Sequence, residues 1–214
     1  MKKLLAIALA FSTMACQSKE KKTMTETQKS EETFDQKNLE IATFAGGCFW
    51  CTEAVFLQID GVKSVLPGYI GGTTINPTYE EISTGKTGHA EAIEITFDPK
   101  KVSFGELLEI FFATHDPTTL NRQGADVGTQ YRSEVFYHNE LQKQITEDYI
   151  ALMNTENTFG KPLVTAVSKA PKFYEAEDYH KNYYSRNTNQ SYCTYVITPK
   201  IEKLNKQFKD KLKK

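Results

Sequence analysis

The sequence lacks an excess of charge of either sign. Its 214 residues include 26 basic and 27 acidic side chains, a formal net charge of −1. Proteins that bind nucleic acid through their overall charge carry a clear basic excess, so we expect no nucleic-acid partner. The composition, 39% hydrophobic and 25% charged, is otherwise that of one globular domain with enough apolar residues for a core.

Cysteine and long apolar runs are also scarce. Four cysteines in a chain of this length are too few for a disulfide-stapled scaffold. A thiol in a special position is therefore more typical of chemistry than of architecture. After the first segment, no apolar run in the sequence is long enough to span a bilayer.

The first residues have the pattern of an export signal. Two lysines precede an apolar stretch at residues 4–11, and small residues then lead to Cys16. The segment resembles a bacterial lipoprotein signal, which implies a signal at residues 1–15 and a lipid on Cys16. An ordinary secretory signal is the alternative. Both predict export to the cell envelope, and lipidation adds membrane attachment through the N-terminal anchor.

Residues 16–38 are rich in Lys, Glu, Thr, Ser and Gln and contain scarcely an apolar side chain. Such a segment cannot bury enough surface to offset its ordering entropy, so we predict a disordered tether. The folded domain then covers residues 39–214.

Hydrophobic patterning in this domain predicts the element order β-α-β-β-α-β-α-β. We expect strands at residues 39–45, 62–69, 89–97, 131–137 and 163–170. We expect helices at residues 49–59, from Ser103 to before Pro117, from Asn139 through Leu152, from about Glu175, and at residues 201–212. This order matches the split β-α-β plan, an α+β, ferredoxin-like sandwich with a mostly antiparallel sheet and helices on one face.

The segment GGCFWC at residues 46–51 places a thiol where a strand turns into a helix. Helix N-terminal amides are unpaired and the helix dipole favours negative charge, so we expect a depressed pKa and a nucleophilic thiolate at Cys48. Cys51 lies on the same helix face, within reach of a disulfide with Cys48. The alternative is a pair of buried, inert thiols. Phe49 and Trp50 either belong to the core or wall an apolar pocket beside the thiol.

Strand 89–97 carries a candidate acid. Alternate residues share a face, so Glu91 heads the apolar face that also contains Ile93 and Ile95. Desolvation there raises the pKa of a carboxyl and leaves it able to donate a proton. The alternative is a hydrated Glu91 beyond the edge of the core.

Two polar segments carry further candidates. The loop at residues 116–130 is too long to be a mere connector, and its Asp126, with Tyr131 just after it, either bonds a polar ligand or shapes a turn. Cys193 lies in a polar stretch that we predict to be a mobile arm. A thiol on such an arm suits disulfide formation with a distant partner.

Five short motifs follow one another along the domain: Gly47–Trp50, Pro77–Glu80, Thr87–Glu91, Gln123–Ser133 and Ala176–His180. Together, in this order and over nearly the whole domain, they resemble the A-type peptide methionine sulfoxide reductase family. Enzymes of this class reduce methionine sulfoxide back to methionine.

The resemblance implies a role for each candidate. Cys48 would attack the sulfoxide sulfur and Glu91 would protonate its oxygen. Tyr79 and Tyr131 would hydrogen-bond that oxygen, Asp126 would fix the polar end of the site, and Phe49 and Trp50 would hold the methyl group. The resulting sulfenic acid would be resolved by Cys193, with Cys51 as the alternative or as a second relay.

The family also implies the partners. The substrate would be the S epimer of methionine sulfoxide, free or in oxidised proteins and peptides. Thioredoxin or an equivalent dithiol would close the cycle, with no bound cofactor, and we expect a monomer.

Two other function classes compete with this assignment. A thioredoxin-like thiol-disulfide oxidoreductase would use Cys48-x-x-Cys51 but would not need Glu91. A non-catalytic binding protein of the envelope would need neither. A metal site is not expected, because Cys48, Cys51, His180 and Cys193 have poor spacing for structural zinc.

Overall fold

The computed structural model describes residues 38–214. The predicted signal at residues 1–15, the predicted lipid on Cys16 and all but the last residue of the tether predicted at residues 16–38 therefore lie outside the described residues. Within the described part, no helix is both long enough and apolar enough to cross a membrane.

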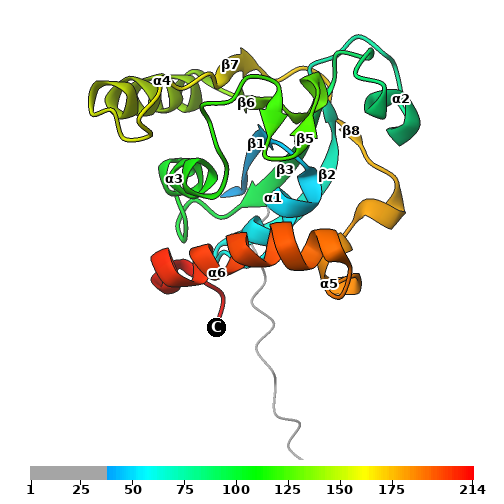
Figure 1. Cartoon of the computed structure of the whole chain (residues 1–214). Helices are drawn as coiled ribbons and strands as arrows, with labels where there is room; N and C mark the ends of the chain where they lie inside the picture. The colour runs from blue at the N-terminus through cyan, green and yellow to red at the C-terminus, as the bar shows by residue number, and fades with distance from the viewer. Residues whose placement is uncertain (1–37) are drawn as a thin grey trace, which may run out of the picture. The chain divides into compact units, whose positions relative to one another are not determined.

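A mixed sheet of strand order β7-β6-β1-β3-β2-β8 forms the centre of the domain (Figure 1). Its strands are β1 (Glu40–Gly46), β2 (Val62–Ile70), β3 (Ala90–Phe97), β6 (Ser133–Tyr137), β7 (Ala166–Lys169) and β8 (Tyr174–Glu175). All neighbours pair antiparallel except β6 and β7. Because β3 lies between β1 and β2, the predicted split β-α-β plan and mostly antiparallel sheet are confirmed.

The alternation predicted for strand 89–97 decides which face of the sheet carries the helices. Ile93, Ile95 and Phe97 are fully buried in the large core beneath the helices. Ala90 and Ala92 face the opposite side, in a small cluster covered by Phe173 rather than by a helix. A helix layer on one face is therefore the arrangement that the period-two pattern indicated.

Four helices make that layer: α1 (Phe49–Phe56), α3 (Phe104–Thr114), α4 (Glu140–Thr155) and α6 (Thr198–Gln207). Figure 1 shows α6 running across α1. The expected capping box of Ser103 and Glu106 starts α3, and the Asn139 side chain caps α4 by accepting from the Gln142 amide.

The apolar stripe expected on α4 is only partly buried. Ile145 and Tyr149 pack against the core, whereas Leu141 and Leu152 are exposed. The intervening buried positions are the polar Gln142 and Thr146, whose side chains bond backbone carbonyls of Ile41 and Gln142. Hydrogen bonding therefore replaces apolar contact on part of this face.

Several short elements were not predicted. A helix, α2 (Tyr79–Ser83), starts at a Thr78–Glu81 capping box, and the long polar loop contains the hairpin of β4 (Arg122–Gln123) and β5 (Asp126–Val127). The helix expected from about Glu175 is wrong at its start. That segment begins with β8, which pairs with the edge of β2, and its short helix α5 (Tyr183–Arg186) comes later.

The predicted mobile arm around Cys193 is also wrong. Residues Cys193–Ile197 form a π-helical segment that leads directly into α6, and both its end residues are buried. This segment packs on α1 because Ile197, together with Leu204 in α6, forms an apolar stripe. The prediction of a mobile arm considered only the polar residues 189–193 and did not include this stripe.

Candidate active site

Cys48 lies at the junction of β1 and α1, as expected, and is 7% exposed. Gly47 has φ +90°, a left-handed conformation that favours glycine, and a Cβ there would lie 2.5 Å from Cγ of Gln123. The glycine thus lets the β4–β5 hairpin close over the start of α1.

The expected depressed pKa of Cys48 is not found. Burial raises its pKa well above the ordinary value, and the hydrogen bond with Cys51 and the nearby Glu91 act in the same direction. The Cys48 side chain accepts no bond at the helix N-terminus, and the Phe49 amide donates to Oε2 of Glu91 instead (3.0 Å). The free amide that was expected to favour a thiolate is thus used by the carboxyl group, so the resting sulfur is a thiol.

Glu91 lies on the helix-facing side of β3 and is 2% exposed. Burial raises its pKa to about 8, although the bond from the Phe49 amide opposes the shift. The carboxyl is therefore mostly protonated at neutral pH and adjoins the residue that follows Cys48. The hydrated alternative is excluded, and a proton donor lies beside the thiol.

Tyr79 and Tyr131 approach the same acid from two other elements. Tyr79 is the first residue of α2, and Tyr131 ends a 3₁₀ turn (Thr129–Tyr131) just before β6. Burial raises the pKa of Tyr79 to about 12, and Glu91 and Cys48 add to the shift. Burial and Glu91 also raise the pKa of Tyr131. Both phenols remain protonated and can donate hydrogen bonds.

Phe49 and Trp50 occupy different surroundings. Phe49 is fully buried in the core, with its ring among those of Tyr69 and Tyr79. Trp50 is partly exposed and stacks on Tyr183 with ring centroids 3.7 Å apart. Of the two, Trp50 is thus the one that presents aromatic surface.

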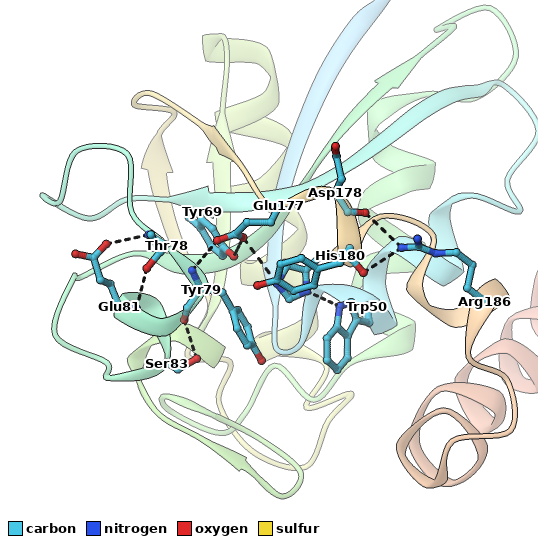
Figure 2. Close-up of polar contacts among 11 residues, drawn as sticks. Trp50, Tyr69, Thr78, Tyr79, Glu81, Ser83, Glu177, Asp178, His180 and Arg186 are labelled. Atoms are coloured by element: carbon cyan, nitrogen blue, oxygen red, sulfur yellow. Dashed lines mark hydrogen bonds and ion pairs between the residues drawn. The ribbon is translucent and has the colours of Figure 1, made fainter.

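Polar contacts of Glu177 and His180 hold these aromatic residues in place (Figure 2). These contacts were not predicted from the sequence. The Glu177 carboxylate accepts from the Tyr69 hydroxyl at 2.7 Å and from the Tyr79 amide at 2.9 Å. His180 is fully buried, and its Nδ1 accepts from Nε1 of Trp50 at 3.0 Å. Both come from the Ala176–His180 motif, which therefore anchors Tyr79 and Trp50.

A cavity of about 220 Å³ opens beside Cys48, which precedes α1, and Cys51 within α1. Asp126 and Tyr192 line it, and the Tyr192 hydroxyl donates to Asp126 at 2.7 Å. Sγ of Cys51 lies 3.8 Å from the same hydroxyl oxygen. Because a phenol has one proton, Cys51 is the donor in that contact. Tyr192, adjacent to Cys193, is a site residue that the sequence reasoning missed.

The three described cysteines gather in one cluster and are free thiols. Cys51 shares a hydrogen bond with Cys48, and Cys193 is fully buried next to Cys51. Across residues 38–214, no group of three or more His, Cys, Asp or Glu side chains is arranged to hold a metal ion.

Comparisons with known proteins give the same family as the motifs of the sequence. The sequence profile of the family described as "Peptide methionine sulfoxide reductase" matches residues 40–212. "Peptide methionine sulfoxide reductase MsrA" of Deinococcus radiodurans is 53% identical over 190 residues, which are 89% of this chain and 92% of that protein. The protein of the same name from Sulfolobus acidocaldarius is 57% identical over 81% of this chain and 97% of its own length.

Solved structures show the same fold. The chain is similar to Mxr1 from Saccharomyces cerevisiae in reduced form, with a TM-score of 0.67, 30% identity, and coverage of 74% of this chain and 91% of that one. It is also similar to methionine sulfoxide reductase A of Corynebacterium diphtheriae, with a TM-score of 0.64, 33% identity, and coverage of 73% and 78%. These matches do not favour the thioredoxin-like alternative. The chain belongs to the peptide methionine sulfoxide reductase family, A type.

Proposed function

We propose that Cys48 performs the methionine sulfoxide reduction of this family with Glu91 as its acid. The observation that carries the proposal is the protonated, buried carboxyl of Glu91, hydrogen-bonded to the amide that follows Cys48. A sulfoxide oxygen is a poor leaving group until it receives a proton, and a neutral carboxyl supplies one.

The chemical step balances within the site. The Cys48 sulfur attacks the sulfoxide sulfur as Glu91 protonates the oxygen, and the proton of the Cys48 thiol replaces the one that Glu91 has given. The resulting hydroxyl group then passes to the Cys48 sulfur as the S–O bond of the substrate breaks. The transient S–S bond breaks with its electron pair returning to the substrate sulfur, so the substrate is reduced by two electrons to a thioether and Cys48 becomes a sulfenic acid. A neutral thiol and a neutral acid at rest avoid two adjacent buried anions.

The substrate oxygen would be held by the hydroxyl groups of Tyr79 and Tyr131. Both phenols are half-buried, and both couple electrostatically to Glu91 and Cys48. Trp50 would contact the methyl group, with Phe49 behind it in the core, and Asp126 would contact the polar part of the substrate from the β4–β5 hairpin.

The proposed activity is tested directly with the two epimers of a methionine sulfoxide peptide. We expect reduced enzyme with dithiothreitol, under anaerobic conditions, to convert the S epimer to methionine and to leave the R epimer unchanged. Chiral separation of the remaining substrate measures both. Retention of peptide without turnover of either epimer would support the binding-protein alternative instead.

We propose Cys51, rather than Cys193, as the thiol that first resolves the sulfenic acid. Cys51 is hydrogen-bonded to Cys48, whereas the buried Cys193 has Cys51 as its neighbouring thiol. Cys51 would therefore condense with Cys48 to a disulfide and water. The Cys193 thiolate would then attack Cys51, releasing Cys48 and leaving a Cys51–Cys193 disulfide.

Cys193→Ser tests this order. Without a reductant, we expect the variant to release one methionine per enzyme and to stop as the Cys48–Cys51 disulfide, because the second exchange has no thiol. Cys51→Ser should instead accumulate a sulfenic acid that dimedone traps. Peptide mass spectrometry distinguishes the two products. A dimedone adduct on Cys193→Ser would show that Cys193 resolves directly.

The reductant we propose is a thioredoxin-like dithiol protein. Two vicinal thiols return two electrons to the Cys51–Cys193 disulfide by a second exchange, without a bound cofactor. Methionine formation beyond one equivalent per enzyme should depend on adding such a protein.

We also propose export and lipid anchoring through Cys16, a proposal that rests on the sequence pattern of residues 1–16. Metabolic labelling with palmitate should mark the wild-type chain and not Cys16→Ser, which should be released from the membrane fraction.

A further inference from the structure

The cavity beside Cys51 contains a positive charge that the proposed chemistry does not use. Lys200, in the first turn of α6, lines this cavity together with Cys48, Cys51, Asp126 and Tyr192. It is partly buried. Its position is decided by the packing of α6 on α1, more than 100 residues away in sequence.

Lys200 is held in place by the end of α3. Its Nζ donates to the carbonyl oxygen of Thr114, the last residue of α3, at 2.9 Å. The last carbonyls of a helix have no partner within the helix, and the helix dipole favours a cation there. The ammonium group is thus fixed beside the cavity rather than free to turn into solvent.

The titratable groups around Cys51 are otherwise acids. They are Cys48 at the N-cap of α1, Glu91 in β3, Asp126 in β5, Tyr192, and Cys193 and Tyr195 in the π-helical segment. A thiolate at Cys51 would be repelled by any of them in its ionised form. Lys200 is the charge in this set that attracts it.

We propose that Lys200 is a positioning residue for the resolving step, where it stabilises the Cys51 thiolate as that sulfur attacks the sulfenic acid of Cys48. The inference rests on the proposed function. In this step the Cys48–Cys51 S–S bond forms and the S–O bond of Cys48 breaks. The departing hydroxide takes a proton and leaves as water, and the proton lost by Cys51 balances it, so no further oxidant is needed.

The same charge has little part in the first step. The pKa of Cys48 responds mainly to burial, to Cys51 and to Glu91, whereas the pKa of Cys51 is lowered by the hydrogen bond with Cys48 and then by the charge of Lys200. Removing the charge should therefore slow disulfide formation more than methionine release.

Lys203 provides a matched control. It lies one turn further along α6, and its Nζ donates to the Ala113 carbonyl, also at the end of α3 (2.6 Å). It is exposed and does not line the cavity. Lys200→Met and Lys203→Met thus each remove one cation and one bond to α3, and they differ in the distance of that cation from Cys51.

The test is a single turnover without reductant from pH 6 to pH 9, in which methionine release and loss of the sulfenic acid are followed separately. For Lys200→Met, we expect the apparent pKa of disulfide formation to rise by about one pH unit and the rate at pH 7 to fall about threefold. The fall is only threefold because the thiolate fraction of Cys51 becomes about tenfold smaller, whereas a thiolate of higher pKa is a stronger nucleophile. Lys200→Arg should restore the wild-type profile, and Lys203→Met should match it.

Equal profiles for Lys200→Met and Lys203→Met would overturn the inference. So would a loss in Lys200→Met that is the same at every pH, because that result indicates altered packing rather than a lost charge. A wild-type enzyme that releases no methionine would instead contradict the proposed function. The two failures are therefore distinguished in one experiment.

Discussion

Replacing Cys48 by serine is expected to abolish methionine formation, with a loss of more than about 10⁴-fold in the rate of the first turnover. A serine hydroxyl is a far weaker nucleophile than a cysteine sulfur. It also cannot take up the sulfoxide oxygen, whereas the cysteine sulfur does so and becomes a sulfenic acid. The side chains are close in size, and Cys48 accepts no capping bond that serine would lose. The fold should therefore persist.

Rapid quench of enzyme and a methionine sulfoxide peptide, without reductant, measures this first turnover. Cys51→Ser serves as the control, because it removes the neighbouring buried thiol but should still release one methionine per enzyme. Methionine formation by Cys48→Ser at a rate near that of wild type would contradict the proposed mechanism.

Replacing Glu91 by glutamine is expected to lower the rate of methionine formation at pH 7 by about 10²–10⁴-fold, the usual contribution of a general acid. Glutamine keeps an oxygen that can accept from the Phe49 amide but has no acidic proton. The wild-type rate should fall as pH rises through about 8, where the carboxyl ionises. The residual rate of the variant should lack that fall.

Glu94→Gln is the matched control for Glu91→Gln. Glu94 belongs to the same strand but points to the opposite face of the sheet, and it is only half-buried. Its replacement should leave the rate and the pH profile unchanged. Thiol-disulfide exchange should survive in Glu91→Gln, so a parallel loss of exchange would revive the thioredoxin-like alternative.

The same Glu91 variant has a second readout in stability. A carboxyl whose pKa is raised in the folded state stabilises the fold fully below its unfolded pKa of 4.5, and the contribution is lost as pH rises through about 8. Glu91→Gln removes this dependence. Denaturant unfolding at pH 5 and at pH 9 measures the effect. Between these pH values the unfolding free energy of the variant should decrease less than that of the wild type, by about 4 kcal/mol.

Features set by neighbours in sequence were predictable. Alternation in β3 placed Glu91 on the buried face with Ile93, because side chains of a strand alternate by geometry alone. The capping box at Ser103 located the start of α3. A second box, Thr78 with Glu81, is the same signal and could have located α2 and therefore the place of Tyr79.

Features set by distant contacts were not predictable in this way. The polar segment before Cys193 is exposed and resembles a mobile arm, yet Cys193 itself is buried because α1 and the π-helical segment that leads into α6 supply its partners. The pKa of Cys48 was predicted in the wrong direction, since packing of distant elements buries the thiol and brings Glu91 close to it. The Phe49 amide donates to this carboxyl, which lies 42 residues further along the chain.

The sequence by itself thus determined the split β-α-β plan, the thiol at a strand–helix junction and the acid on the buried face of its strand, since each follows from local periodicity or from turn and cap chemistry. The tertiary structure decided the protonation of Cys48 and Glu91, the closeness of three thiols and the place of Lys200 beside Cys51. The physical reason is that desolvation and charge–charge coupling depend on which groups are brought together in space, and separation along the chain does not encode them.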